Sequence, residues 1–507
     1  MVDVIVGIES RFPVDRWTIA GVHVWPLIRI RLYDALTDQA GRASEATVPP
    51  VRSSWDVFSG RERNAVRRLA RRFVSAVRRP RSSMRARIAG KRLATHYDAL
   101  FYSLTHMRTR IDGVWYDRHC DPLIDILQAE SGQRVLLLES AYELGHRRPR
   151  AHESSVIDID TWLTRTAGKA EAISSPERTL DGFPEFAEWL RAEFPETRGH
   201  DISVASVERD VASLISLEKA FERVLSDSRP RACFVVCYYH VPAMALIWAS
   251  RRLGIPSVDL QHGMQAGPPY ARWTKVPPGG FETLPEIFWN WNASDAEGIR
   301  EWSEASGSPH RAVVGGYPWL DRFLTTGAST TNGVMPPLAT DSKRPLRILF
   351  SMPTFSYDLP SWVVSAIRAS PPEWEWWFRL HPRQLQARAG LERVLRDDDS
   401  TVRFEIESAT ARPLPLVLQD VDVHVTHSSA VTIEAEYFGV RTVALSPDTA
   451  RSFANQANAG TLVVATDALS LVDAIRWQAD GRTYPAIGGA GKGRQTRETL
   501  AALLAAQ

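Results

Sequence analysis

The sequence is poor in cysteine, with only Cys120, Cys233 and Cys237 in 507 residues. Three scattered residues without a CxxC pair exclude a disulfide framework and favour a reducing compartment. An excess of charge of one sign is also missing, because 61 Lys and Arg stand against 59 Asp and Glu, for a net charge of +2. The whole molecule is therefore not an obvious nucleic-acid-binding protein.

Long hydrophobic runs are scarce as well. One run of nineteen residues without a formal charge, from Ala232 to Ser250, is long enough to suggest a membrane span. His240 and Pro242 interrupt it, and β-rich FVVCYY changes to helix-forming AMALIWASRR, so we predict a buried strand followed by a helix. The N-terminal segment MVDVIVGIESRFPVDRW has no basic leader and indicates a first strand rather than a signal peptide.

What is present is the composition of a globular protein, with 44% hydrophobic and 24% charged residues. The length suits three ordinary domains or two large ones. The segment Thr325 to Pro345 is rich in Thr, Gly and Pro and predicts a linker. We therefore predict one domain over 1–335 and a second over 336–507, whose last helix is a candidate to cross back to the first.

Strand-like segments alternate with helical ones on both sides of this linker. Alternation of this kind predicts an α/β fold, with two Rossmann-like doubly wound domains that face each other across a cleft. The strands are expected within 134–140, 234–239, 257–263, 286–292, 311–321, where the strand ends in a turn, 346–353, 375–382, 401–407, 421–429 and 441–447.

One segment concentrates positive charge. Between Arg61 and Arg92 there are thirteen Lys and Arg and one acid, a local net charge of +12 that leaves −10 for the remaining chain. Its apolar residues recur at helical spacing, which predicts an amphipathic helical insertion that ends at Pro80. One interpretation is that these charges form a solvated face of the protein, and another is that the segment binds an anionic membrane surface. Binding to nucleic acid is disfavoured because no nucleic-acid-binding module is recognised.

Three loops of the second domain carry polar side chains where predicted strands end. Carboxyl ends of parallel strands share one edge of a sheet, so these loops are expected to converge. Ser429 suits the N-cap of a helix that begins at Ala430, and free backbone N–H groups there favour an anion. The functional interpretation is that these loops form a pocket for a phosphate. The structural interpretation is that Ser429 only caps a helix and His381 only ends a strand. The residues concerned are Pro353, Thr354, Arg379, His381, Pro382, Arg383, Ser428 and Ser429.

A resemblance to a known family rests on THSSAVTIEAEYFGVRTVAL, from Thr426 to Leu445, and on RLHPR before it. These runs resemble the donor domain of GT-B glycosyltransferases with cytidine-nucleotide donors, such as bacterial sialyltransferases and capsule Kdo transferases, and more distantly teichoic acid polymerases. DLQHG and GGYPWLD also resemble the end of the first domain in surface-polysaccharide transferases of this group.

The resemblance implies that residues 1–335 form the acceptor side and that 336–507 bind the nucleotide sugar. It implies that His381, Ser428 and Ser429 hold the donor phosphate and that Glu434 faces the ribose or the phosphate loop. Glu405 or Glu407 would approach the sugar or the base. Asp397 to Asp399 read as a polar helix end, so we predict neither a metal nor another cofactor.

Inverting sugar transfer needs a base that takes the proton of the acceptor hydroxyl. The first domain offers His262 in LQHG, whose ordinary pKa near 6.5 suits proton transfer, and after it Asp112, Glu9 and Glu139. A purely structural role across the interdomain hinge is the alternative for His262.

The predicted function is transfer of a sugar, Kdo or another ulosonic acid, from a CMP-activated donor to a surface glycan or lipid-linked acceptor. A CDP-polyol phosphotransferase of the teichoic acid type is the alternative within the enzymes. A non-catalytic GT-B-like scaffold that binds a nucleotide or a glycan is the alternative outside them. The expected location is cytoplasmic, with peripheral attachment to the plasma membrane through Arg61 to Arg92.

Overall fold

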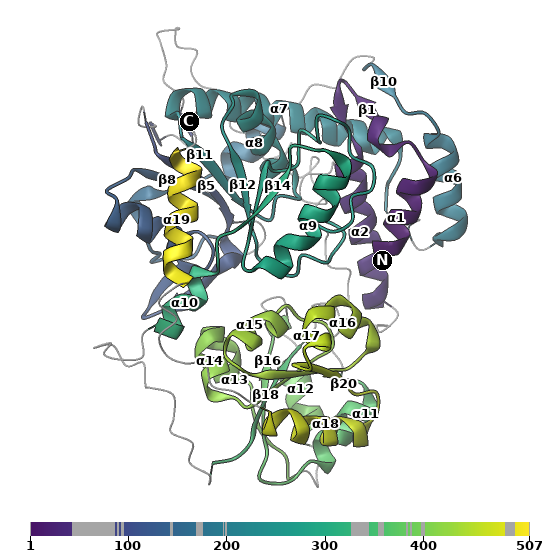
Figure 1. Cartoon of the computed structure of the whole chain (residues 1–507), viewed down its shortest axis with the longest axis vertical. Helices are drawn as coiled ribbons and strands as arrows, with labels where there is room; N and C mark the ends of the chain where they lie inside the picture. The colour runs from purple at the N-terminus through teal and green to yellow at the C-terminus, as the bar shows by residue number, and fades with distance from the viewer. Residues whose placement is uncertain are drawn as a thin grey trace, which may run out of the picture.

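The computed structural model describes residues 2–42, 87–88, 91–92, 96–141, 145–168, 176–195, 197, 200–325, 344–352, 359–381, 384–385, 388–396, 401–481 and 492–505. Two lobes stack along the long axis of the molecule (Figure 1). Each lobe contains one large sheet, of seven strands in the first and six in the second, and every strand pair in both sheets is parallel.

The first sheet has the order β14-β13-β12-β11-β5-β8-β9. Apolar side chains fill its central strands, and the rings of Phe101 and Phe234 stack with centroids 4.7 Å apart on neighbouring strands. The strands are β5 (Ala99–Leu104), β8 (Val135–Ser140), β9 (Val156–Asp158), β11 (Ala232–Val236), β12 (Ser257–Leu260), β13 (Ile287–Asn290) and β14 (Arg311–Val314).

The helices that belong to this lobe include a long one, α7, whose N-cap Ser203 accepts a hydrogen bond from the Ser206 N–H. They are α1 (Val2–Arg11), α2 (Trp25–Arg42), α4 (Asp121–Asp125), α5 (Asp160–Ala167), α6 (Phe183–Glu193), α7 (Val204–Ser228), α8 (Val241–Arg252), α9 (Ala293–Ser306) and α10 (Pro318–Thr325). Short antiparallel pairings add β1 (Thr18–Ile19), β2 (Val22–His23), β10 (Arg178–Thr179), β6 (Arg108–Ile111) and β7 (Val114–Asp117).

The second sheet has the order β17-β16-β15-β18-β19-β20. Its strands are β15 (Arg347–Ser351), β16 (Glu375–Arg379), β17 (Arg403–Glu405), β18 (Val423–Thr426), β19 (Arg441–Ala444) and β20 (Leu462–Val464). Its helices are α11 (Ser361–Ala369), α12 (Arg388–Leu395), α13 (Glu407–Ala411), α14 (Leu414–Asp420), α15 (Val431–Tyr437), α16 (Pro447–Ser452), α17 (Ala454–Asn458) and α18 (Ala468–Asp480).

Both sheets follow the doubly wound order in which the first strand lies centrally and the chain winds outward from it in both directions. The predicted fold class, α/β with two Rossmann-like doubly wound domains, is confirmed. Strand and helix also alternate where the sequence suggested a membrane span, because Ala232–Val236 is β11 and Val241–Arg252 is α8. Among the residues that the structure describes, no helix has the length and apolar character needed to cross a bilayer.

Two elements connect the lobes. Trp319 and Leu320 of α10 pack with Leu414 and Val417 of α14 in one buried cluster. The C-terminal helix α19 (Lys492–Ala505) returns to the first lobe (Figure 1), where Thr496 Oγ1 donates to the carbonyl of Gly315 at 2.7 Å. Positions 326–343 of the predicted linker lie outside the described residues.

The predicted first strand is wrong, because residues Val2–Arg11 form helix α1. The β-branched run suggested a strand, but Ile5 and Ile8 recur at helical spacing and both are fully buried. Of the basic segment, only Arg87–Ile88 and Lys91–Arg92 are described, as the paired strands β3 and β4. The amphipathic helix predicted before Pro80 lies outside the described residues.

Candidate functional site

The site begins with a loop that follows β7 and displays Arg118 and His119. Asp117 Oδ1 accepts hydrogen bonds from the N–H groups of His119 and Cys120, both at 2.9 Å. Asp121 Oδ2 accepts from the Asp117 N–H at 2.7 Å. These two aspartates form a closed local turn, which holds the backbone between them in one conformation.

The second component is His262, in the loop after β12. One ring nitrogen, Nε2, lies 3.0 Å from the Tyr239 hydroxyl, and the other, Nδ1, lies 3.4 Å from the Tyr270 hydroxyl. A methyl group added at the neighbouring Gly263 would lie 4.0 Å from Ala430 Cβ of the second lobe. The loop therefore reaches across the domain interface to the start of α15.

Burial dominates the electrostatics of this loop. It lowers the pKa of His262 to about 4, with a further lowering from the Arg118 charge, and it raises the pKa of Asp259 to about 8. Asp259 accepts hydrogen bonds from the Tyr238 N–H and the Tyr270 hydroxyl, each at 3.0 Å. At neutral pH the His262 ring is therefore uncharged and able to accept a proton.

Tyr317, just after β14, links the two lobes. Its ring stacks on His119, with centroids 5.8 Å apart and planes 6° from parallel. Its hydroxyl donates to Glu434 Oε1 of α15 at 3.4 Å. Burial raises the pKa of Glu434, and the charges of Arg118 and Arg379 act in the opposite direction. Tyr317 and Arg118, from two loops of the first lobe, thus interact with Glu434 at the interface.

Arg118 and Arg379 bring two positive charges to this interface. Arg118 Nε donates to the carbonyl of Met107 at 3.1 Å, and Arg379 Nη1 donates to those of Ala409 and Arg412 at 2.6 and 2.9 Å. Carbonyl oxygens carry no formal charge, and the buried carboxyl group of Glu434 supplies a single negative charge that acts on both guanidinium groups. Burial lowers the pKa of Arg379 to about 10, and repulsion from Arg118 adds to that effect. An anion between them would relieve this repulsion.

The predicted phosphate loops follow β16, β15 and β18, which are neighbours in the second sheet. His381 is half-buried, and its N–H donates to Gln384 Oε1 at 3.3 Å. Ser428 is exposed. The N-cap of α15 is Ala430, one residue later than predicted, although Ser429 Oγ accepts from the Val431 N–H at 3.3 Å. Thr354, Pro382 and Arg383 lie outside the described residues.

Two candidate bases of the first domain lie elsewhere. Glu9 is fully buried, and its carboxylate binds Arg29 and accepts from Trp25 Nε1 at 2.9 Å and from the Thr274 N–H at 2.7 Å. These partners occupy both carboxylate oxygens inside the first lobe, so the structure assigns Glu9 a role in packing. Asp112 is exposed at the turn between β6 and β7, where its φ of 48° favours a tight hairpin.

Glu405 and Glu407, which were expected to approach the sugar or the base of the nucleotide, also make local contacts. Glu405 Oε1 accepts from the Ser408 N–H at 2.5 Å, and exposed Glu407 pairs with Arg388 at 3.3 Å. Both contacts connect α13 to its surroundings.

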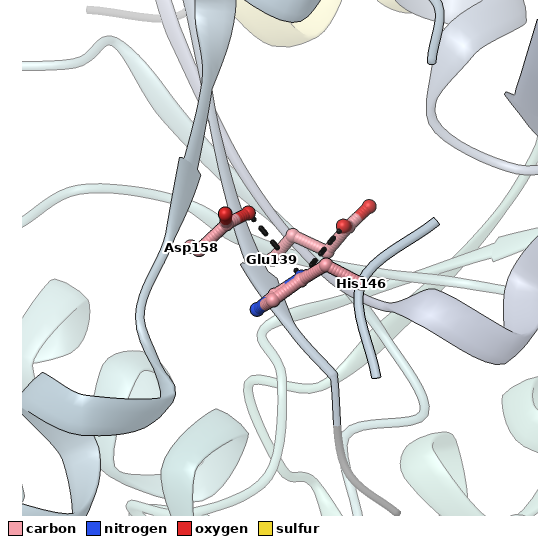
Figure 2. Close-up of side chains that lie close together, drawn as sticks. All are labelled: Glu139, His146 and Asp158. Atoms are coloured by element: carbon pink, nitrogen blue, oxygen red, sulfur yellow. Dashed lines mark hydrogen bonds and ion pairs between the residues drawn. The ribbon is translucent and has the colours of Figure 1, made fainter. Parts of the chain in front are cut away.

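A separate polar cluster surrounds Glu139, the remaining base candidate, at the end of β8. Figure 2 shows His146 between Glu139 and Asp158, and its Nδ1 lies 3.1 and 3.2 Å from their carboxylates. These three residues have the chemistry of a metal site. Arg150 Nη1, however, lies 2.7 Å from Glu139 and 2.6 Å from Asp158, and Arg108 binds the other Glu139 oxygen. Because the two arginines already neutralise these carboxylates, the cluster fits an ion-pair network better than a cation site.

Sequence reasoning missed Arg118, His119 and Tyr317. A local signal existed for the first two, since a strand followed by Asp-Arg-His-Cys-Asp places two side-chain acceptors around one turn. Tyr317 belongs to the GGYPWLD run, but nothing in that run indicates contact with Glu434, which lies 117 positions away in sequence.

Comparison with known proteins gives a likeness in structure alone. No family model matches the sequence, and no curated protein matches it. UDP-GlcNAc 2-epimerase from Neisseria meningitidis is 13% identical over 80% of this chain and 100% of its own, with a TM-score of 0.46. CalG4, the calicheamicin glycosyltransferase, is 13% identical over 81% of this chain and 95% of its own, with a TM-score of 0.42. The glycosyltransferase of kitacinnamycin is 15% identical over 80% and 95%, with a TM-score of 0.41.

Proposed function

We propose that this chain is a glycosyltransferase that moves Kdo or another ulosonic acid from a CMP-activated donor to a surface glycan or glycolipid, with inversion. The observation that carries the proposal is the approach of Arg118 and Arg379 across the domain interface, beside Glu434. Two arginines from opposite lobes would clamp a donor phosphate, and stabilisation of the leaving phosphate is what such a transfer requires of the protein. The cytidine and ulosonic acid assignments rest on the sequence resemblance.

Within this proposal His262 is the base. Its ring is uncharged at neutral pH, and the hydroxyls of Tyr239 and Tyr270 orient it. Burial, and then the charge of Arg118, lower its pKa. A phosphate bound to Arg118 would offset the second effect and raise the pKa of His262 toward the range that suits proton transfer. Donor binding would thus make His262 a stronger base for taking the proton of the acceptor hydroxyl, whose oxygen attacks the sugar.

Release of CMP from CMP-sugars tests the proposal. The purified protein is incubated with CMP-Kdo or CMP-sialic acid and a bacterial membrane extract, and CMP is followed by mass spectrometry. We expect release that depends on both donor and extract. Nucleotide binding without release from any donor would contradict the proposal and favour a scaffold that binds nucleotides. A parallel incubation with a CDP-linked polyol as donor tests the alternative, and transfer of polyol phosphate to the acceptor with release of CMP would favour the phosphotransferase instead.

A further inference from the structure

A cavity lies between the lobes, and Tyr317, which interacts with Glu434, is among the residues that line it. Its volume is about 740 Å³, within the range of small-molecule sites. The start of α9, in the first lobe, and the end of α15 with α17, in the second lobe, line the cavity. Asn455 of α17 donates a hydrogen bond to Ser294 of α9, which joins the two lobes beside it. Gln495 of α19 closes one side. Three parts of the chain that are distant in sequence thus enclose one space.

Two of the aromatic residues that line the cavity, Trp291 and Tyr317, are 5% and 3% exposed. Their rings stack on each other, with centroids 4.0 Å apart and planes 6° from parallel. Tyr317 also touches His119 and Glu434, so the cavity and the site described above share this side chain. A molecule in the cavity would therefore lie next to the reacting groups of the proposed transfer.

The polar lining is acidic and rich in amides. Asp295 accepts from Gln261 Nε2 at 2.8 Å and from Asn292 Nδ2 at 2.9 Å, which holds its carboxylate in place. Glu436 accepts from Gln456 Nε2 at 2.8 Å in the second lobe. None of the described residues that line the cavity is Lys, Arg or His. The cavity therefore opposes a phosphate or a carboxylate, in contrast to the neighbouring site.

Carboxylate and amide side chains supply acceptors and donors for the hydroxyl and amine groups of a sugar. We infer that this cavity binds a hexosamine unit without negative charge. On the proposed function, on which this part of the inference rests, that unit belongs to the acceptor glycan. The two neighbouring sites would then separate an anionic donor from an acceptor that is uncharged or cationic.

The test compares two alanines of α9 that are both exposed. Ala293 lines the cavity and Ala305 does not. Ala293→Trp fills the space, and Ala305→Trp adds the same side chain to the same helix as a matched control. Saturation-transfer NMR with N-acetylglucosamine, glucosamine and N-acetylneuraminic acid reports binding, and thermal unfolding shows that both variants fold.

We expect the two hexosamines to bind the wild-type protein and Ala305→Trp, and to bind Ala293→Trp at least about tenfold more weakly. N-acetylneuraminic acid should not compete with them. Glu436→Gln should weaken glucosamine more than N-acetylglucosamine, because it removes one negative charge. Equal binding to both tryptophan variants, or competition by N-acetylneuraminic acid, would overturn the inference.

Calorimetry with CMP on the wild-type protein and the two tryptophan variants separates this inference from the proposed function. Hexosamine binding without CMP binding would leave the cavity inference standing and remove the proposed function. CMP binding without hexosamine binding would overturn the cavity inference and leave the proposed function standing.

Discussion

Asp259 of β12 and His262 in the loop that follows it show how burial shifts the pKa values of an acid and a base in opposite directions. Burial raises the pKa of the carboxyl to about 8 and lowers that of the imidazole to about 4, so both shifts favour the neutral form. The Tyr270 hydroxyl contacts both residues, at 3.0 Å from Asp259 and 3.4 Å from His262. The loop at the interface is thereby kept uncharged near pH 7, next to the charge of Arg118.

Asp259→Asn tests this description through stability. The folded pKa of about 8 exceeds the ordinary value of 3.8, so between these values the unfolded state releases a proton that the folded state keeps. The free energy of unfolding therefore falls as pH rises through this window in the wild-type protein. The asparagine side chain does not titrate, so the free energy of unfolding of Asp259→Asn relative to that of the wild-type protein should rise by up to about 3 kcal/mol between pH 5 and pH 7.5. Urea unfolding at both pH values measures this, and a constant difference would contradict it.

Arg118→Ala tests the proposed phosphate clamp. Loss of a hydrogen bond to a charged group costs about 1.5–3 kcal/mol, so affinity for CMP should fall by roughly ten- to a hundredfold, as measured by calorimetry. Arg110→Ala is the matched control, because Arg110 is exposed on the neighbouring strand β6. Equal affinity for CMP in the two variants would show that Arg118 does not bind the phosphate.

At the scale of elements, the sequence predicted strands well where apolar runs ended in a breaker. The segments that became β8, β11, β12, β13, β15 and β18 are of this kind. It failed at Val2–Arg11, where β-branched residues belong to a helix, and it did not anticipate β5, which pairs with β11 and β8 in the first sheet. Pairing with segments far apart in sequence places β5 in the sheet, and local patterns do not contain that information. At Val2–Arg11 the helical spacing of Ile5 and Ile8 was present in the sequence, but the β-branched run also favoured a strand.

The candidate site shows the same limit. The positions of the predicted strand ends indicated that polar loops gather at one edge of the sheet. Tertiary packing decides which residues of the other lobe these loops contact. Tyr317 meets Glu434, and Gly263 faces Ala430, only because the two lobes are held in one arrangement. Glu9 had the right chemistry for a base, yet its contacts with Arg29 and Thr274 place it in the core.

Helix α19 contributes to that arrangement, and its packing can be tested. Leu500 is 1% exposed and belongs to the core of the first lobe. Leu500→Ala should lower the free energy of unfolding by about 2–5 kcal/mol, as is usual when a buried leucine is truncated. Arg494→Ala on the exposed face of the same helix should change it by less than about 0.5 kcal/mol. Chemical denaturation measures both, and similar effects would show that α19 is not docked on the core.

At the scale of the whole molecule, charge is distributed unevenly although the net charge is only +2. The basic segment carries a local charge of +12 and suits anionic lipid headgroups. Deletion of residues 61–92 should release the protein from vesicles that contain phosphatidylglycerol, while affinity for CMP is retained. Sedimentation with vesicles at low and high salt measures the release, and unchanged binding would leave the segment as a solvated surface.

We propose that a cytidine nucleotide binds between Arg118 of the first lobe and Arg379 of the second. Titration calorimetry of the full chain with CMP, CDP, UDP and GDP under identical conditions tests this proposal. We expect the cytidine nucleotides to bind most tightly. Tighter binding of UDP or GDP than of CMP and CDP would contradict the cytidine assignment, and no binding of any nucleotide would contradict the proposal as a whole.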